Sequence, residues 1–510
     1  MYKQIRLGLA AIIVFFSLMT RASERPNIIV FLVDDMGWQD TSEPFWEEVT
    51  PLNKRYRTPS MSRLASEGMK FTNAYACPVC TPTRTSLMSG MNAAHEGITN
   101  WTSPLKDRNT DNSDEQMAGA SWNFNGLSPV PGIEKTIHAT PFPELLKEAG
   151  YFTIHVGKAH WASQGTPGAS PHHMGFMVNI SGHAGGHPQS YLGEDNYGNI
   201  PGKAQPQAVP DLEEYFGTDT FLTEALTLEA IRAMEAPIRN KQPFFLNMCQ
   251  YAVHTPIMAD KRFVQKYYDA GLDPIEARYA SLIEGMDKSL GDIMDYLEKM
   301  NVDRNTIIIF MSDNGGLSLT PPRGDEPFTH NLPLKAGKGS VYEGGIREPM
   351  IVKWPGVVQP KTVASQYVIV EDFFPTILQM AEVKDYKIVQ PVDGKSFVPI
   401  LENPEYSDTT RVLVWHSPNK WTRNDGPGIN YFSAVRQGKW KLVYNMRNGK
   451  RELYNLDADI GELNDLSLQH PAKVKELSAL ISDRLREWQS PMPAFKSTGM
   501  RVPYPDGVRE

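Results

Sequence analysis

The sequence is poor in cysteine, with three in 510 residues. Cys77 and Cys80 lie close together, whereas Cys249 stands alone. Three cysteines build neither a disulfide framework nor a four-cysteine zinc site. The Cys-x-x-Cys spacing of Cys77 and Cys80 leaves a redox pair or half of a metal site open as one interpretation.

Long apolar runs are also scarce. One run spans residues 7–19, preceded by Lys3 and Arg6 and followed by the small residues Ala22 and Ser23. It is short for a membrane span of about 20 residues. The arrangement is typical of a secretory signal peptide over residues 1–22, with a membrane anchor as the alternative. Since no later segment predicts a span, we expect a secreted or periplasmic protein, and the scarcity of cysteine favours the periplasm.

Basic residues do not dominate the composition. Lys and Arg number 51 against 59 Asp and Glu, which gives a net charge of −8 and argues against nucleic acid as a partner. We find no internal repeat and no coiled-coil heptads. With 41% hydrophobic residues, the chain is long enough for one large core and a smaller attached domain.

Four apolar runs predict strands buried on both faces of a parallel sheet: 27–33, 151–156, 243–248 and 306–311. Polar residues follow them in turn, namely Asp34 and Asp35, Lys158 and His160, His254, and Asp313 and Asn314. Parallel strands end at the same edge of a sheet, so we expect these side chains to converge in one crevice. Helical spacing at 273–297 and 141–150 adds covering helices, and the predicted class is α/β with a mixed, mainly parallel sheet.

The composition shifts near residues 383–410. Beyond it, strands are predicted at 411–416, 431–436 and 440–444, and a helix at 472–488. We therefore expect a catalytic domain over 24–390 and a C-terminal α+β domain of antiparallel sheet and helix over 405–510. His416 could reach a substrate at the domain interface, but we expect it to be structural.

Two long polar stretches, 102–134 and 163–210, interrupt the pattern and predict functional loops. Large aromatic residues lie in or beside them: Trp101, Trp122, Trp161 and Tyr191. Such rings stack on sugar faces or pack loops onto a core, and the sequence leaves both interpretations open.

Charged residues in two predicted turns suggest a cation site and an anion-binding site. Asp34 and Asp35 are adjacent at the end of a buried strand, where a hard divalent cation would offset their cost; a solvated turn is the alternative. Lys338 lies between two glycines, so we prefer it to Lys335 as an anion-binding residue, with a solvated surface lysine as the alternative.

The stretch 80–90 carries the strongest signal. Thr81 and Pro82 predict a helix cap and first helical position, which places Cys80 at a helix N-terminus. That end favours an anionic nucleophile and an anionic substrate group. Arg84 lies one turn further on and faces the same way.

The pattern Cys80-Thr-Pro82-Thr-Arg84 closely resembles the signature of formylglycine-dependent sulfatases of the alkaline-phosphatase superfamily. Further blocks resemble that family in the same order, at residues 27–35, 157–160, 254–256, 313–315, 337–347 and 436–442. The resemblance implies an alkaline-phosphatase-like fold and conversion of Cys80 to formylglycine by a sulfatase-maturing enzyme. One departure is Ala159, where the family often has Trp.

The resemblance also implies roles for single residues. It implies one Ca²⁺ per chain, bound by Asp34, Asp35, Asp313, Asn314 and the modified Cys80. Arg84 would hold the aldehyde hydrate, and Lys158 and Lys338 the sulfate oxygens. His254 would protonate the departing sugar oxygen, and His160 would accept a proton from the hydrate.

These features predict hydrolysis of a sulfate ester on a carbohydrate. A phosphate or phosphonate ester hydrolase of the same superfamily is one alternative, and an inactive relative that binds sulfated glycan is another. The sequence leaves the sugar, the sulfated position, exo or endo action and the oligomeric state open.

Overall fold

A nine-stranded sheet forms the centre of the computed structural model, which describes residues 25–508 except 121, 204 and 325. The strand order is β11-β2-β10-β9-β1-β8-β6-β7, with β12 beside β2. The central strands β9, β1, β8 and β6 are parallel, whereas β10 is antiparallel to β9 and β2. The predicted mixed, mainly parallel sheet is confirmed. The bounds are β1 (Asn27–Val33), β2 (Met69–Tyr75), β6 (Phe152–Gly157), β7 (Val178–Ile180), β8 (Phe244–Cys249), β9 (Thr306–Ser312), β10 (Arg347–Lys353), β11 (Thr362–Ala364) and β12 (Val368–Ile369).

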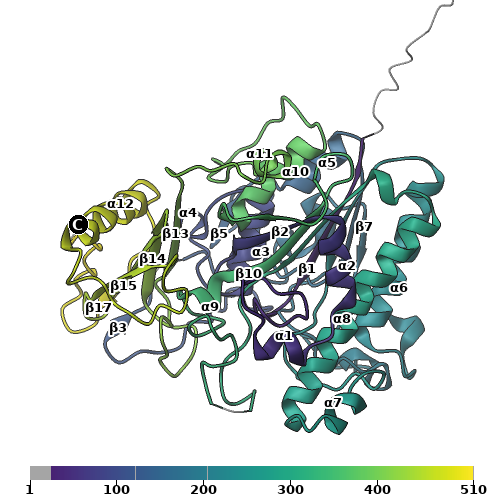
Figure 1. Ribbon diagram of the computed structural model, residues 1–510, viewed down its shortest axis with the longest axis horizontal. Coiled ribbons are helices and arrows are strands. Elements are labelled where there is room, and N and C mark those ends of the chain that lie inside the picture. The colour runs from purple at the N-terminus through teal and green to yellow at the C-terminus, as the bar shows by residue number, and fades with distance from the viewer. Residues whose placement is uncertain (1–24, 121, 204, 325, 509–510) are drawn as a thin grey trace, which may run out of the picture.

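Helices cover both faces of this sheet (Figure 1). Alternate residues of β1 belong to two cores, Ile28 and Val30 to one and Ile29 and Phe31 to the other, because successive side chains of a strand point to opposite faces. One face packs against α2 (Pro59–Glu67), α6 (Leu222–Arg239) and α8 (Pro274–Lys299), the other against α3 (Cys80–Ser89), α5 (Phe142–Glu148) and α10 (Phe373–Met380). Shorter helices are α1 (Pro51–Arg55), α4 (Ala93–Glu96), α7 (Gln265–Asp269), α9 (Glu343–Ile346) and α11 (Val398–Glu402).

The two predicted helices are confirmed at α8 and α5. Asp273 caps α8, because its carboxylate accepts from the backbone N–H groups of Ile275 and Glu276. Gly150 follows α5 with φ 93°, a backbone conformation that ends a helix without a Cβ penalty.

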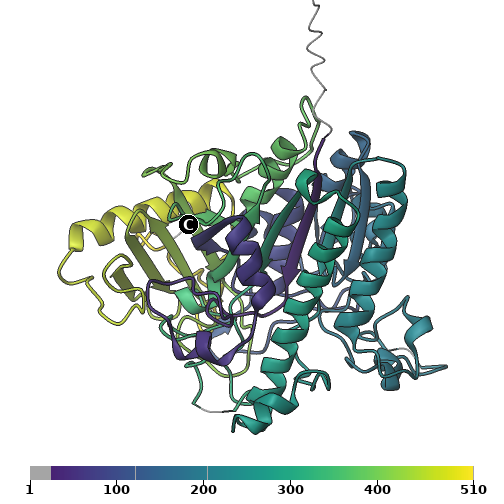
Figure 2. The same cartoon turned by 45° about the vertical axis from the view of Figure 1, so that its right-hand side comes forward.

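A second, antiparallel sheet has the order β13-β14-β15-β16 and packs against α12, as Figure 2 shows at the yellow end of the chain. This confirms the predicted C-terminal arrangement, although β16 was not predicted. The domain limits 24–390 and 405–510 stay a prediction. The bounds are β13 (Val412–Ser417), β14 (Phe432–Gln437), β15 (Trp440–Asn445), β16 (Arg451–Asn455) and α12 (Pro471–Glu487).

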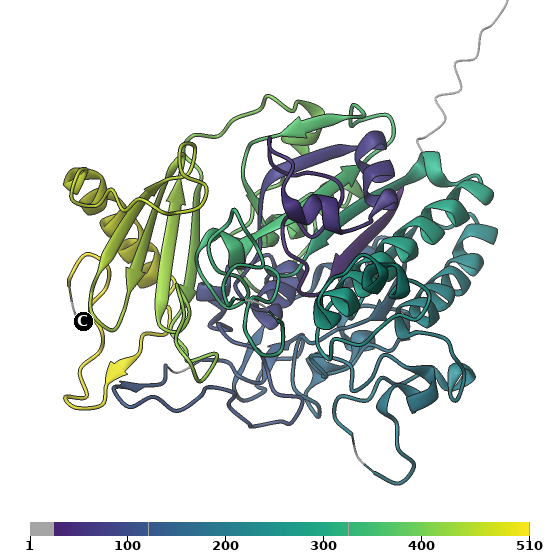
Figure 3. The ribbon, with the colours of Figure 1, turned by 60° about the horizontal axis from the view of Figure 1, so that its bottom comes forward.

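The long stretches 102–134 and 163–210 are more ordered than simple loops. The first contributes β3 (Met117–Ala118), which pairs with β17 (Ala494–Phe495), and β4 (Gly126–Ser128), which pairs with β5 (Thr136–His138). The blue chain along the lower edge of Figure 3 follows this course. The stretch 163–210 supplies β7 and three 3₁₀ turns, at residues 167–169, 171–174 and 193–198. Three of the four aromatic residues are buried, namely Trp122, Trp161 and Tyr191, so these pack against protein rather than face a ligand.

The predicted signal peptide, 1–22, lies outside the described residues. Within the described part of the chain, no helix combines the length and apolar character that a membrane crossing requires.

Candidate active site

The predicted site residues meet at one edge of the main sheet. Asp34 and Asp35 follow β1, Lys158 and His160 follow β6, and Asp313 and Asn314 follow β9. The loop after β8 supplies His254, the loop before α9 supplies Lys338, and α3 after β2 supplies Cys80 and Arg84. Since these strands run in the same direction, their carboxyl ends place the side chains in one crevice.

The predicted start of α3 is wrong by two residues. The helix begins at Cys80, its N-cap is Val79, and Thr81 makes no capping hydrogen bond. The Thr81 hydroxyl instead accepts from the Thr102 backbone N–H at 3.0 Å, so a contact between two loops replaces the cap. Cys80 still lies in the first turn of the helix, where free N–H groups favour an anion.

Close backbone packing sets the turns that carry these side chains. A Cβ at Gly157 would lie 2.0 Å from the Cys249 carbonyl oxygen, and a Cβ at Gly315 would lie 1.9 Å from the Gly344 carbonyl oxygen, so both positions require glycine. Asp35 and His160 adopt φ values of 65° and 53°, which non-glycine residues rarely take. Such strain concentrates at functional sites.

Two carboxylates at the end of β1 pair with lysines from different loops. Lys158 Nζ lies 2.7 Å from Asp34 Oδ2, and Lys338 Nζ lies 2.5 Å from Asp35 Oδ1. Burial raises the pKa of Asp34 well above its usual range, and nearby Asp313 adds to this. Burial acts the same way on Asp35, but His254, Lys338 and Lys158 more than offset it and hold its pKa below the usual range. The two neighbours therefore have different electrostatic surroundings.

Arg84 connects the helix to two other parts of the site. Its Nε donates to Asp313 Oδ2 at 2.9 Å, and its Nη1 donates to the Lys158 carbonyl oxygen at 2.9 Å. The Asn314 amide donates to Asp35 Oδ1 at 2.8 Å. All of these side chains are buried, so the charges are held in fixed positions without bulk water.

Cys80 faces His160. Its Sγ lies 3.4 Å from His160 Nδ1, and His160 Nε2 lies 2.9 Å from the Thr102 carbonyl oxygen. The carbonyl oxygen only accepts, so the hydrogen is assigned to Nε2 and Nδ1 presents its lone pair to position 80. Burial, reinforced by Lys158, lowers the pKa of His160 well below its usual value, which keeps this imidazole neutral.

His254 approaches the site from the other side. Its Nε2 lies 3.6 Å from Asp35 Oδ2, and its Nδ1 lies 2.9 Å from the Thr255 carbonyl oxygen. Burial lowers the pKa of His254, although Asp35 opposes the shift. A bound anion beside Nε2 would raise this pKa, because it favours the charged imidazole.

Several oxygen atoms in the crevice are available to a cation. Asp34 Oδ1 and Asn314 Oδ1 are buried, and neither has a hydrogen-bond partner among the described residues. Ligand atoms of Asp34, Asp35 and His254 lie within 4.8 Å of one another. Carboxylate and amide oxygens suit a hard divalent ion, so the residues present fit a metal centre.

A cavity of about 360 Å³ opens above these groups. Cys80, His160, His254 and Lys338 line its charged base. Its upper wall combines aromatic and polar side chains from three separate parts of the chain, including Trp101, His187, Gln207 and Trp421. The geometry is that of a small pocket in which a thiol, two imidazoles, a carboxylate and an ammonium group converge, as in the active sites of enzymes.

Comparison with protein families agrees with this geometry. The family model described as Sulfatase matches residues 26–383. The chain belongs to the sulfatase family. It is therefore a sulfate-ester hydrolase. A second family model, described as N-sulphoglucosamine sulphohydrolase, C-terminal, matches residues 337–490.

Individual sulfatases resemble the chain along most of its length. A "Sulfatase" of Formosa agariphila is 31% identical, with 96% of this chain and 94% of that protein covered. Human N-acetylgalactosamine-6-sulfatase is 31% identical, with 93% and 87% covered. The crystal structure of Ps i-CgsB in complex with k-i-k-neocarrahexaose is 27% identical, with a TM-score of 0.67 and 95% of each chain covered.

Cys77 and Cys80 form no disulfide bond in this sulfatase, and their surroundings differ. All three cysteines are unpaired, and burial together with Glu371 and Glu96 raises the pKa of Cys77. Cys80 instead lies beside Lys158 and Lys338, which oppose the rise that burial causes in its pKa.

Lys335 and His416 lie outside the crevice, in agreement with the preference for Lys338 over Lys335 and with the structural role expected for His416. Lys335 lies 3.9 Å from the centre of the Tyr342 ring and donates to the Glu462 carbonyl oxygen. His416 is buried and hydrogen-bonded to Ser433, with a pKa lowered to about 4 by burial. Both are structural.

The sequence did not single out several residues of the upper wall. Trp421 comes from the loop between β13 and β14, and it packs so closely on Gly339 that a Cβ there would lie 2.2 Å from the ring. His187 stacks on His254 with ring centres 5.6 Å apart and an interplanar angle of 9°. No motif marks these residues, because tertiary packing alone brings them to the pocket.

Proposed function

We propose that this enzyme hydrolyses a sulfate ester on a carbohydrate outside the cytoplasm, with Cys80 converted to formylglycine and one Ca²⁺ bound. The observation that carries the proposal is the position of Cys80. It lies in the first turn of a helix, 3.4 Å from a neutral His160, beside two lysines that are already paired with carboxylates. Export by a signal peptide over 1–22, into the periplasm, and modification by a sulfatase-maturing enzyme belong to the same proposal.

The cation would be held by Asp34, Asp35, Asp313, Asn314 and the modified position 80. The unpartnered oxygens Asp34 Oδ1 and Asn314 Oδ1 support this set. When bound, the ion would offset the clustered carboxylates and polarise a sulfate oxygen.

As formylglycine, position 80 would supply an aldehyde hydrate whose hydroxyl attacks the sulfur. Arg84 would orient this group, since it lies one helical turn away and is fixed by Asp313 and the Lys158 carbonyl oxygen. His160 would accept a proton at Nδ1, the nitrogen that faces position 80. A neutral imidazole with its Nε2–H held by Thr102 suits that task.

Lys158, Lys338 and His254 would act on the bound sulfate. The two lysines lie in the base of the site, where they would stabilise the charge that builds on the sulfate oxygens. His254 would protonate the leaving oxygen from Nε2. Its Nδ1 hydrogen is directed to Thr255, so a proton on Nε2 makes the ring an imidazolium, which Asp35 at 3.6 Å stabilises.

A sugar is the leaving group that the upper wall of the pocket favours. Trp101 and Trp421 present aromatic surface, and His187 and Gln207 present hydrogen-bonding groups, which is a typical lining for a sugar ring. The names of similar proteins support a carbohydrate, since one acts on N-acetylgalactosamine 6-sulfate by name and another is bound to a neocarrahexaose.

The test is a mass spectrum of the tryptic peptide 71–84 from protein produced with a sulfatase-maturing enzyme. We expect an aldehyde in place of the Cys80 thiol, and sulfate release from sulfated mono- and oligosaccharides. A Cys77→Ala variant is the matched control and should be modified and active. A Cys80 that stays a thiol while a control sulfatase is converted would contradict the mechanism, and preferential release of phosphate would favour the phosphatase alternative.

A further inference from the structure

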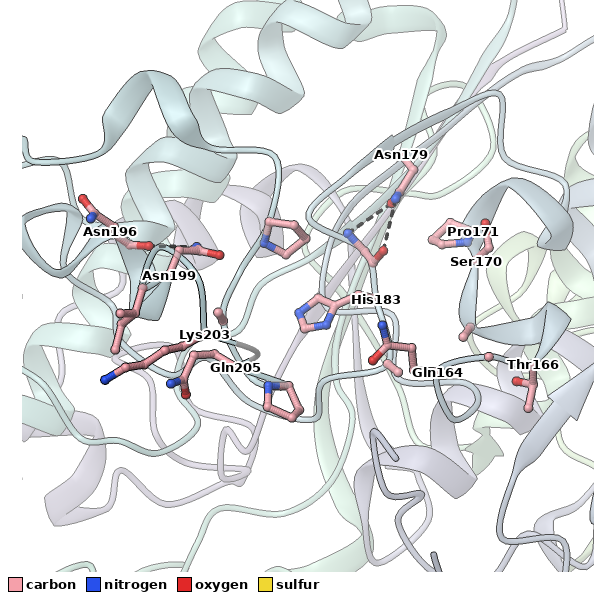
Figure 4. A pocket seen from close by; sticks show the side chains of 18 of the residues that line it. Gln164, Thr166, Ser170, Pro171, Asn179, His183, Asn196, Asn199, Lys203 and Gln205 are labelled. Carbon is pink, nitrogen blue, oxygen red and sulfur yellow. Dashed lines mark hydrogen bonds between the residues drawn. The ribbon is translucent and has the colours of Figure 1, made fainter. Parts of the chain in front are cut away.

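A second, larger pocket of about 750 Å³ lies beside the catalytic cavity. The segment 164–216 lines it, and Figure 4 shows side chains of this lining. Among the described lining residues there is no Asp or Glu, Lys203 is the one permanent cation, and most of the polar side chains carry an amide or a hydroxyl group. Such a lining suits a ligand rich in hydroxyl groups with at most one acidic group.

The two pockets share a thin wall. Gln207 lines the catalytic cavity, whereas its neighbours Pro206 and Ala208 line the second pocket. Likewise Gly186 lines the cavity and Ala184 lines the second pocket. Consecutive Cα atoms are 3.8 Å apart, so at these two places the wall between the pockets is about one residue thick.

His183, which lines this pocket, carries a hydrogen-bond donor without a partner among the described residues. Its Nδ1 accepts from the Gly185 backbone N–H at 3.0 Å, and burial lowers its pKa to about 4, so the ring is neutral and its hydrogen is on Nε2. Nε2 is buried and has no partner among the described residues. The ring lies in the middle of the view of the pocket in Figure 4, and Gln164 lines the same pocket. A buried donor without a partner is costly, which a ligand oxygen would relieve.

Not every amide in the pocket is free. The Asn179 side chain donates to the Gly182 carbonyl oxygen and accepts from the Gly182 N–H, each at 3.1 Å, so it holds the turn before His183 in place. Asn199 donates to the Asn196 and Val209 carbonyl oxygens. Gln164 has no side-chain hydrogen bond within the described part of the chain, and its amide is therefore available together with His183.

We propose that this pocket is a second saccharide subsite, which binds the sugar next to the sulfated residue of an oligosaccharide. The inference rests on the proposed carbohydrate sulfatase function and deepens it. It makes the preferred substrate a chain of at least two sugars rather than a sulfated monosaccharide. His183 and Gln164 bind sugar oxygens there and take no part in the chemical step.

The test compares sulfate release from monosaccharides and from their tetrasaccharides, using a panel of 6-sulfated N-acetylgalactosamine, N- and O-sulfated glucosamine and sulfated galactose. The variants are His183→Phe, which keeps a ring but removes the donor, and Gln164→Ala at an exposed position. Gln469→Ala, an exposed glutamine near α12, is the matched control. We expect each subsite variant to raise KM for the cleaved tetrasaccharide about tenfold, equivalent to about 1.4 kcal/mol. Values for the monosaccharide, and both values for Gln469→Ala, should stay unchanged.

The outcomes separate the two proposals. Cleavage of monosaccharide and tetrasaccharide with equal kcat/KM in the wild type, or an unchanged KM in both variants, would overturn the subsite and leave the sulfatase function intact. An equal loss on both substrates would assign His183 to the catalytic site instead and also overturn it. If protein with a confirmed aldehyde at position 80 cleaves no member of the panel, the proposed carbohydrate function fails, and the subsite fails with it.

Discussion

Two groups of charged side chains are buried in this sulfatase, and they differ in how completely the protein pairs them. The site cluster lies at the carboxyl edge of the main sheet and consists of Asp34, Asp35, Asp313, Arg84, Lys158 and Lys338. The interface cluster joins the main sheet to the C-terminal sheet and consists of Glu343, Glu462, Lys441, Arg347 and Arg436. Both hold acidic and basic groups away from water, which is costly unless each charge finds a partner.

The interface cluster is closed by the protein's own side chains. Lys441 Nζ lies 2.8 Å from a carboxylate oxygen of Glu343 and 2.8 Å from one of Glu462. The Tyr75 hydroxyl donates to Glu343, and Arg436 donates to that same hydroxyl oxygen. These contacts connect β15 and β14 to α9 and β2, so this cluster holds the two sheets together.

The site cluster has equal numbers of acids and bases but is not closed. Asp34 Oδ1 accepts no hydrogen bond within the described part of the chain and lies 3.9 Å from Arg84 Nη2, whereas Lys441 lies 2.8 Å from its partner oxygens. The Asn314 amide oxygen also has no hydrogen-bond partner there, and Lys338 faces the cavity. A closed cluster of charges suits a structural role, whereas an open one with spare oxygens and an accessible cation is suited to bind a metal ion and an anionic substrate. This difference in pairing predicts that changes in the site cluster mainly affect metal binding and activity, whereas changes in the interface cluster mainly affect the free energy of unfolding.

The largest effect should follow removal of the divalent cation from the site cluster. We expect a chelator to lower sulfate release at least about a thousandfold, because the ion supplies several kcal/mol of charge stabilisation. The melting temperature should fall as well, since an ion bound only by the folded state stabilises it. Metal content by mass spectrometry, activity and thermal unfolding measure the three effects, and Ca²⁺ should restore them.

An Asn314→Ala variant sharpens this prediction, because it removes an oxygen ligand without changing a charge. It should bind Ca²⁺ more weakly, whereas Lys441→Met in the interface cluster should bind it as the wild type does. Full activity in metal-free protein would show that the site cluster is as complete as the interface cluster.

The next largest effect should follow Lys441→Met. This change leaves Glu343 and Glu462 buried without their shared cation, and breaking a buried ion pair typically costs about 3 kcal/mol or more. We expect that loss in the free energy of unfolding, measured by urea denaturation, with kcat per folded molecule nearly unchanged. Lys288→Met, which breaks an exposed pair with Asp292, is the matched control and should cost less than about 0.5 kcal/mol. A loss of kcat without a loss of stability would assign Lys441 to catalysis.

The sequence predicted the site cluster better than the interface cluster. The apolar runs that precede Asp34, Lys158 and Asp313 were enough to predict that these residues meet, because parallel strands place the residues that follow them at one edge of the sheet. The flanking glycines favoured Lys338 over Lys335, and the family resemblance favoured an anion-binding role over that of a solvated surface lysine. Glu462 was not predicted, because nothing in a local pattern indicates that a residue after β16 meets α9.

Errors in the fold had similar causes. The N-cap of α3 was misplaced because Thr81 bonds to the distant Thr102 instead of its own helix, and tertiary contacts override local propensity. β7 was missed within a stretch rich in glycine and proline, since three residues give too short a pattern. Trp421 reaches the pocket from the C-terminal sheet, a contact that only the folded chain shows.

Glu96 provides a third case, a buried carboxyl group whose partner is neither a metal nor a basic side chain. It ends α4 behind α3 and accepts hydrogen bonds from the hydroxyl groups of Thr85, at 2.7 Å, and of Ser89. Burial raises its pKa to about 8, more than these two hydrogen bonds lower it. A proton therefore neutralises Glu96 where a lysine neutralises Glu343.

The smallest expected effect is the pH dependence that this proton creates. The pKa of Glu96 is higher in the folded than in the unfolded protein, so its contribution to stability is full below about pH 4.5 and is lost as the pH rises to about 8. Glu96→Gln does not titrate and keeps an oxygen for the hydroxyl groups. Its free energy of unfolding relative to wild type should therefore rise by about 1–2 kcal/mol between pH 6.5 and pH 8. Urea denaturation at both pH values measures this, with the exposed Glu235→Gln as a control that should show no such change. If the difference stays constant, Glu96 is charged in the folded protein, and a cation outside the two clusters must pair with it.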